Sequence, residues 1–235
     1  MNIEKILVLP VAFACALCFS ACEGDNIVSV KTEPAAESGN QSEKSDDPTN
    51  QGSTEKLLID DFEDGDGISA LGDPWYTGSD AGTGAESTIE PGAKDAGGQP
   101  KPTKTDNGSK NALSFKYTLK KSGYEWDPFV NWGVHLPAGK DYSNYTGITY
   151  RYKGGYHSIR IETSDVKDSD YHLKRMNSTK EWTLATVEFS ELAQEGWGVS
   201  YKFDPSHITG ISIQVKGPDD TDSLAIDDVY LITSP

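Results

Sequence analysis

Cysteine is scarce in this chain, and its placement limits how the protein can be stabilised. The three cysteines, Cys15, Cys18 and Cys22, all lie in the first two dozen residues. A mature chain beginning at Cys22 would keep only that one, which excludes a disulfide framework. The fold must therefore be stabilised by a buried core, with or without a bound metal.

Basic residues are also few. The chain has 21 Lys and Arg against 37 Asp and Glu, which gives a formal net charge of −16. No basic stripe is present, and such a surface repels phosphate backbones, so we expect no nucleic-acid partner. The acidic excess is compatible with a hard cation such as calcium.

The longest apolar run is short. Residues 6–20 are apolar apart from the final serine, whereas a membrane-spanning helix needs about 20 apolar residues. The small residues Ser20 and Ala21 then precede Cys22 and a polar stretch, and this pattern resembles a lipobox. We therefore expect residues 1–21 to be a lipoprotein signal peptide. Lipid on Cys22 would anchor the exported protein to a membrane, most simply the outer membrane or cell surface; an ordinary secretory signal is the alternative.

Large apolar side chains are nearly absent from residues 22–56, which are rich in Ser, Glu, Asp, Asn, Pro and Thr. Such a composition cannot bury enough surface to fold, so we expect a disordered acidic linker. Treated as a coil, it would span roughly 30–35 Å. Residues 57–235 remain, a suitable length for one domain.

No sustained helical stripe occurs in that domain, and its pattern is β throughout. Apolar and polar residues alternate over 113–119, 148–153, 158–162 and 211–215, which predicts strands with one face in a core. Further strands are expected near 57–62, 87–89, 130–136, 171–176, 183–189 and 223–233, and one helical turn near 189–195. Many short strands separated by turn signals favour an all-β sandwich, most simply a jelly roll.

Catalytic motifs are missing as well. The sequence contains no Gly-x-Ser-x-Gly elbow, His-x-x-x-His pair or phosphate-binding loop, and its four histidines have no ligand spacing. No pair of carboxylates stands out as the acid and base of a glycosidase. These absences favour binding over catalysis.

Aromatic residues are plentiful, with five Trp and eleven Tyr. An exposed Trp or Tyr offers a flat surface on which the apolar face of a sugar ring can stack. The candidates for such stacking are Trp75, Tyr76, Trp126, Trp132 and Trp197; the last is flanked by glycines that would leave room for a ligand. We expect Trp182, at a strand start, to belong to the core instead.

Polar candidates accompany the aromatic ones. Arg160 and Gln214 alternate with the apolar residues of their strands, so they should point away from the core. Planar guanidinium and amide groups can form paired hydrogen bonds to neighbouring hydroxyls. Tyr171, His172 and Gln194 complete the predicted polar set.

The order of several motifs resembles a known family. The domain opens on Leu-Leu-Ile-Asp-Asp-Phe-Glu-Asp at 57–64 and closes on Leu-Ala-Ile-Asp-Asp-Val-Tyr-Leu at 224–231; between them lie Tyr-Ser-x-Tyr-x-Gly-Ile at 142–148 and Phe-Asp-Pro-x-x-Ile-x-Gly-Ile at 203–211. Together they resemble the family 11 carbohydrate-binding modules. Phe129 and Val215 depart from the family, since tyrosines that contact ligand are usual there. The opening and closing motifs also resemble the domain of complex I intermediate-associated protein 30.

Carboxylates at the two ends of the domain suggest a metal. Asp61 and Glu63 lie near the first predicted strand and Asp227 in the last, and these strands are often neighbours in a jelly roll. Converging carboxylates would repel one another unless a cation such as Ca²⁺ bound them. The family resemblance also implies calcium here, whereas a solvated acidic edge is the alternative.

The sequence thus predicts a monomeric, non-catalytic domain that binds a β-glucan, either cellulose or mixed-linkage glucan. Endoglucanase activity is the first alternative. An assembly domain, which would expose an apolar patch, is the second.

Overall fold

The computed structural model describes residues 55–90 and 98–233. The predicted signal peptide, Cys22 and nearly all of the predicted linker lie outside these residues. Within the described part of the chain, no helix is long and apolar enough to cross a membrane.

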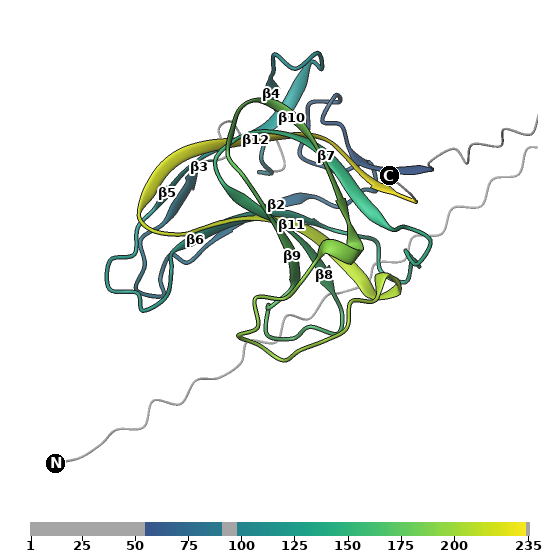
Figure 1. Cartoon of the computed structure of the whole chain (residues 1–235). Coiled ribbons are helices and arrows are strands. Elements are labelled where there is room, and N and C mark those ends of the chain that lie inside the picture. The colour runs from purple at the N-terminus through teal and green to yellow at the C-terminus, as the bar shows by residue number, and fades with distance from the viewer. Residues whose placement is uncertain (1–54, 91–97, 234–235) are drawn as a thin grey trace, which may run out of the picture. The chain divides into compact units, whose positions relative to one another are not determined.

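The described residues form two antiparallel sheets that pack face to face (Figure 1). The seven-stranded sheet has the order β10-β7-β12-β5-β3, with β1 paired to β12 and β4 paired to β5. Its strands are β1 Lys56–Asp60, β3 Thr88–Glu90, β4 Thr103–Lys104, β5 Asn111–Leu119, β7 Gly147–Gly154, β10 Thr179–Glu188 and β12 Asp220–Ile232. The predicted all-β sandwich is confirmed.

The five-stranded sheet has the order β2-β6-β11-β8-β9. Its strands are β2 Trp75–Ser79, β6 Phe129–His135, β8 His157–Thr163, β9 His172–Met176 and β11 Ile208–Lys216. Two 3₁₀ turns, η1 Phe189–Glu191 and η2 Pro205–His207, are the described helical segments. Strands β2 and β4 were not predicted, because both lie in polar, glycine-rich sequence.

The core lies between the sheets and is built from the inward residues of alternating strands. The rings of Phe115 on β5 and Trp132 on β6 join the two layers, with centroids 4.4 Å apart. Tyr150 on β7 meets His157 on β8 through a hydrogen bond of 2.8 Å between Oη and Nε2. Burial of these side chains supplies the main driving force for folding.

The short turn after β7 passes the chain from one sheet to the other. Gly154 has a φ of +126°, and a Cβ there would lie 2.1 Å from the Ser223 carbonyl oxygen. Only glycine accepts both the conformation and the close approach. The turn predicted from Gly154 and Gly155 therefore connects β7 of one sheet to β8 of the other.

The first and last strands are neighbours, as expected. β1 pairs with β12 in antiparallel register, with Leu57 opposite Leu231. The remaining sheet, β2-β6-β11-β8-β9, turns its other face away from the core, and that face carries the candidate site.

Candidate functional site

A cleft of about 910 Å³ lies over the outer face of the five-stranded sheet. Its strand residues alternate with core residues, so they project away from the core: Tyr76, Phe129, Asn131, His135, Arg160, Glu162, Leu173, Gln214 and Lys216. Loop residues complete the lining: Tyr124, Trp126, Asp127, Ser169, Asp170, Tyr171, Glu195 and Trp197.

Small residues in the middle of the sheet make room for this cleft. One cross-strand row runs from Tyr76 through Gly133, Ser212 and Arg160 to Leu173. A Cβ on Gly133 would lie 2.7 Å from the Tyr76 hydroxyl oxygen, so glycine is needed for the tyrosine to cross β6. Gly133 and Ser212 therefore leave space between the larger side chains of the row, and this space forms the floor of the cleft.

Glu162 organises the centre of the floor. Its Oε1 accepts hydrogen bonds from the Tyr76 hydroxyl at 3.1 Å and from the Ser212 hydroxyl at 2.7 Å. Burial, followed by the nearby Glu162 charge, raises the pKa of Tyr76, so its hydroxyl stays protonated and acts as a donor. The carboxylate is only 8% exposed and is held in one orientation.

Arg160 lies beside it and is equally fixed. Its Nη2 donates to the Ser169 carbonyl at 2.7 Å, and its guanidinium carbon lies 5.1 Å from the centroid of the Tyr171 ring. This geometry is a cation–π contact. These two contacts hold the guanidinium of Arg160 in place where it lines the cleft.

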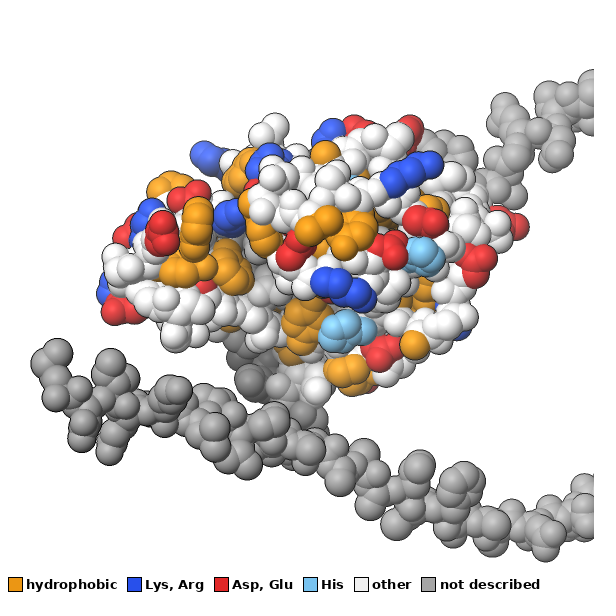
Figure 2. All heavy atoms as spheres, turned by 90° about the horizontal axis from the view of Figure 1, so that it is seen from below, with side chains coloured by type: hydrophobic (Ala, Val, Ile, Leu, Met, Phe, Trp, Pro, Cys, Tyr) orange, Lys and Arg blue, Asp and Glu red, His pale blue; other side chains and the backbone are white. Residues whose placement is uncertain are grey.

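Exposed aromatic side chains border the floor. Trp126 is 64% exposed and Trp197 is 59% exposed, although both are large and apolar. The ring of Tyr76 stacks on His135 with centroids 5.0 Å apart and an interplanar angle of 25°. The face of the domain seen from below carries apolar side chains among charged and histidine side chains (Figure 2).

Glu195 links the aromatic border to the floor. It accepts hydrogen bonds from Arg175 Nη2 at 2.6 Å, Lys216 Nζ at 2.7 Å and Trp197 Nε1 at 3.2 Å. Burial raises its pKa, but the hydrogen bond and charge of Lys216 outweigh that effect and keep the pKa of Glu195 below its ordinary value. Glu195 is therefore ionised at neutral pH.

Trp75 and Trp132 are not in the cleft, which corrects their prediction as stacking residues. Trp75 is 2% exposed and donates through Nε1 to Asp60 at 2.7 Å, and Trp132 is fully buried against Phe115. Both occupy the inward positions of β2 and β6, so their outward neighbours, Tyr76 among them, reach the cleft instead.

His172 and Gln194 also lie outside the cleft lining. His172 occupies an inward position of β9, where its Nε2 lies 3.0 Å from the Tyr201 carbonyl and its ring packs edge-on against Phe203. The neighbouring Leu173 takes the outward position. Gln194 donates to two loop carbonyls, so it supports a loop rather than presenting its amide to a ligand.

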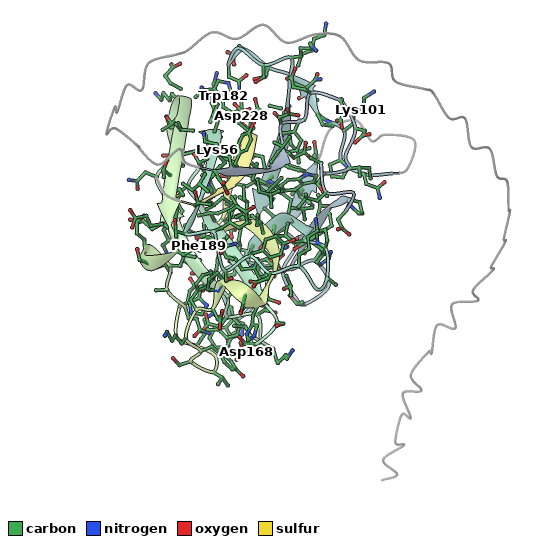
Figure 3. The ribbon with its side chains drawn as sticks, turned by 90° about the vertical axis from the view of Figure 1, so that its right-hand side faces the viewer. Lys56, Lys101, Asp168, Trp182, Phe189 and Asp228 are labelled. Carbon is green, nitrogen blue, oxygen red and sulfur yellow. The ribbon has the colours of Figure 1, made fainter. Side chains whose placement is uncertain are left out.

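Trp182 is another correction. The prediction placed it in the core, but it is partly exposed and donates through Nε1 to Asp106 at 2.7 Å. It lies on β10, an edge strand of the seven-stranded sheet whose pairing is irregular between Thr179 and Thr183. Figure 3 places Trp182 and Asp168 at opposite ends of the domain.

The cleft brings together six of the ten predicted carbohydrate-binding residues: Tyr76, Trp126, Arg160, Tyr171, Trp197 and Gln214. Sequence reasoning missed Tyr124, Asn131, His135, Glu195 and Lys216 as lining residues. Asn131 and His135 could have been found, because they share the outward parity of β6. Glu195 and Tyr124 lie on loops, for which no periodicity exists.

The predicted calcium ligands have other partners. Glu63 Oε1 accepts from the backbone N–H groups of Lys110 and Asn111, Asp227 Oδ2 accepts from Asn107 Nδ2, and Asp61 Oδ1 accepts from the Glu63 N–H. Among the described residues, no group of three or more His, Cys, Asp or Glu side chains is placed to hold a metal ion. Calcium therefore stays a prediction.

A second groove of about 930 Å³ lies on the seven-stranded sheet. Its lining includes Lys116, Lys153 and Lys180, and its one aromatic residue, Phe115, is buried in the core. Volume therefore does not distinguish the two grooves. The exposed aromatic border and the fixed polar floor select the first as the candidate site.

Comparison with known proteins agrees with this architecture. No family model matches the chain. Over 177 residues it is 44% identical to Endoglucanase 3 of Fibrobacter succinogenes, a match that covers 74% of this chain and 27% of the relative. The chain thus spans about a quarter of the length of that curated relative.

Solved structures resemble the fold at low sequence identity. A family 11 carbohydrate-binding module from Clostridium thermocellum, in complex with a β-1,3-1,4-mixed-linked tetrasaccharide, is 17% identical with a TM-score of 0.52; the match covers 75% of this chain and 94% of that one. The solution structure of a Clostridium thermocellum module, CtCBM11, is 18% identical with a TM-score of 0.51, over 79% and 99% of the two chains. The chain therefore has the two-sheet β-sandwich fold of the family 11 carbohydrate-binding modules.

Proposed function

We propose that the cleft binds a β-glucan, cellulose or mixed-linkage β-1,3-1,4-glucan, without cleaving it. The observation that carries this proposal is the pair of exposed indoles, Trp126 and Trp197, at the edge of a floor of immobilised polar groups. Water solvates an indole face and the C–H face of a sugar poorly, so stacking removes both from solvent. The mixed-linkage tetrasaccharide bound by the structural neighbour supports this choice of ligand.

The floor supplies orientation. Arg160 and Glu162 present a planar donor and a planar acceptor that are already held by protein contacts, and Gln214 adds an amide. Sugar hydroxyls are well hydrated in solution, so each new hydrogen bond returns on the order of 1 kcal/mol. Affinity should come from the aromatic residues and selectivity from the polar ones.

The charge of the cleft favours an uncharged chain. Its lining carries the carboxylates of Asp127, Glu162, Asp170 and Glu195 against the cations of Arg160 and Lys216. A polyuronate would therefore meet net repulsion in addition to the desolvation of its own charges. A neutral glucan meets neither.

Hydrolysis is the alternative that the name of the Fibrobacter relative raises. A glycosidase needs one carboxyl group held protonated and a second held ionised. The pKa of Glu195 is lowered, the Asp170 carboxylate accepts three backbone hydrogen bonds, and Glu162 accepts two hydroxyl bonds. Each of these carboxylates has a supporting role, which favours binding.

An assembly domain resembling complex I intermediate-associated protein 30 is less well supported. The large hydrophobic residues that are exposed in the described part of the chain are Trp126, Tyr156, Leu184, Trp197 and Val199. Two of the five line the cleft and a third is on the same loop as Trp197, so they do not form a separate apolar docking patch.

Affinity electrophoresis in gels that contain barley mixed-linkage glucan or hydroxyethyl cellulose tests the proposal. We expect dissociation constants in the micromolar to millimolar range, about −8 to −4 kcal/mol. Trp126→Ala and Trp197→Ala should each weaken binding by about 30-fold, which corresponds to the loss of about 2 kcal/mol at one aromatic contact. Trp182→Ala is the matched control, because it removes a partly exposed indole that lies outside the cleft lining, and it should bind like the wild type.

Two results would contradict the proposal. One is a wild-type domain that migrates unretarded in every glucan. The other is release of reducing ends from the glucan by the purified domain, with loss of that release in Glu162→Gln, since this would make the cleft an active site.

A further inference from the structure

The loop that carries Trp197 has no regular structure of its own. Residues 194–199 contain no strand or helix residue, and the bridge between Leu173 and Ala193 attaches the base of the loop to β9. Trp197 is exposed at its tip. An indole on an unsupported loop would lose binding free energy to the ordering of the loop.

A buried carboxylate supports this loop. Asp170, 2% exposed, accepts from the Glu195 N–H at Oδ1 (2.9 Å) and from the N–H groups of Gly196 and Gly198 at Oδ2 (2.9 Å and 3.0 Å). Trp197 lies between the two glycines. Three converging backbone N–H groups form an anion-binding concavity, so the carboxylate fixes the backbone on both sides of the indole.

Asp168 holds the far side of the loop. Its Oδ2 accepts from the Val199 N–H at 2.7 Å, and its Oδ1 accepts from the Asp170 N–H at 3.1 Å. A Cβ on Gly198 would lie 2.5 Å from Asp168 Oδ2, and Gly196 has a φ of +90°. The approach of this acidic segment thus favours glycine at position 198, and the positive φ favours glycine at position 196, so neither glycine needs a ligand to explain it.

Gln194 closes the arrangement. Its Nε2 donates to the carbonyls of Asp170 at 2.7 Å and Val199 at 2.9 Å, while its Oε1 accepts from the Tyr201 N–H at 2.7 Å. The loop is therefore tied to the segment before β9 at both of its ends. The two segments are joined through side chains and not through a sheet ladder.

From this geometry we infer that Asp170 is a positioning residue for glucan binding that acts through Trp197. The inference rests on the proposed function, since it names how one stacking surface is preorganised. Loss of the carboxylate frees the loop, and ligand binding must then order the indole again. The expected penalty for one immobilised side chain corresponds to roughly 3- to 10-fold in affinity.

A double-mutant cycle on affinity tests the inference. Asp170→Asn in the wild-type background should weaken glucan binding by roughly 3- to 10-fold. In the Trp197→Ala background the same substitution should change affinity little, because the group it positions is gone. Asp165→Asn is the matched control: it removes a carboxylate from the same acidic segment, but one that pairs with His207 at 2.6 Å and does not touch the loop.

Equal losses in the two backgrounds would overturn the inference, as would unchanged affinity of Asp170→Asn. If Asp170→Asn fails to fold, Gly198→Ala provides the same cycle, because its Cβ displaces the loop from Asp168. If the wild-type domain binds no glucan, the proposed function fails. The order of the loop is then measured by acrylamide quenching of Trp197 in a background that carries both Trp126→Phe and Trp182→Phe, since the remaining Trp75 and Trp132 are buried. Asp170→Asn should increase the quenching constant in that background.

Discussion

Two buried titratable residues outside the cleft, Asp60 and His157, have opposite effects on how stability depends on pH. Burial raises the pKa of Asp60 to about 7, against hydrogen bonds from Phe62 and Trp75 that lower it. Burial lowers the pKa of His157 to about 4. The Gly155 carbonyl fixes the proton of His157 on Nδ1, so Nε2 accepts from the Tyr150 hydroxyl and the ring is neutral in the fold.

These shifts predict cancelling pH dependences. Asp60 binds its proton more tightly in the folded state, so its stabilisation is complete below pH 3.8 and is lost as the pH rises through about 7. His157 binds its proton less tightly in the folded state, so its stabilisation is complete above pH 6.5 and is lost as the pH falls toward 4. Between about pH 4 and 6.5 the two residues change the free energy of unfolding in opposite directions, each by about 3 kcal/mol over the interval.

Replacing either residue should reveal the pH dependence that the other one contributes to the free energy of unfolding. In Asp60→Asn the free energy of unfolding should rise with pH from 4 to 6.5, whereas in His157→Gln it should fall over this interval. The wild type should be flatter than either variant. Urea midpoints measured at half-unit pH steps check this, and three parallel profiles would refute the assignment.

At the scale of secondary-structure elements, alternation was a good guide to strands and to their inward and outward side chains, but a poor guide to the exposure of the outward ones. β8 is buried along its whole length: its inward residues lie in the core, and its outward residues Arg160 and Glu162 are covered at the floor of the cleft. The sequence pattern predicted a solvated outer face there. Arg160 and Glu162 are buried because the segment before β9 and the crossing Tyr76 side chain lie over them.

The pairing of β1 with β12 is where the calcium prediction is tested. A cation held by Asp61, Glu63 and Asp227 would join both ends of the domain, and a hundredfold excess over its dissociation constant would stabilise the fold by about 2.7 kcal/mol. The prediction is a melting temperature that rises with added CaCl₂, falls with chelator, and loses this response in Asp227→Asn. A melting temperature unaffected by both additions would contradict the site and agree with the N–H donors that these carboxylates already have.

At the scale of the whole molecule, we propose that lipid on Cys22 holds the domain at a membrane surface. The pattern before Cys22 carries this proposal, and it lies outside the described residues. Cys22→Ser should abolish incorporation of labelled fatty acid and move the protein to the soluble fraction or leave it unprocessed. Unchanged labelling and fractionation of the variant would refute the anchor.

The sequence by itself determined the fold class and indicated the sugar binding that we propose. Period-two alternation over 113–119, 148–153 and 211–215 indicates strands that share a core, and with no cysteine after position 22 the domain has to be stabilised by burial. The abundance of tryptophan in an otherwise polar chain indicated sugar stacking. The first and last strands were correctly expected to be neighbours.

Only the tertiary structure decided which aromatic side chains line the cleft. Trp75 and Trp132 are only one residue away from neighbours that line the cleft. Because successive side chains of a strand point to opposite faces, that one residue places them in the core. Trp197 owes its position to Asp170, which is distant in sequence and binds the loop through backbone N–H groups. Local patterns encode the two faces of a strand, but what covers each face depends on segments brought together by folding.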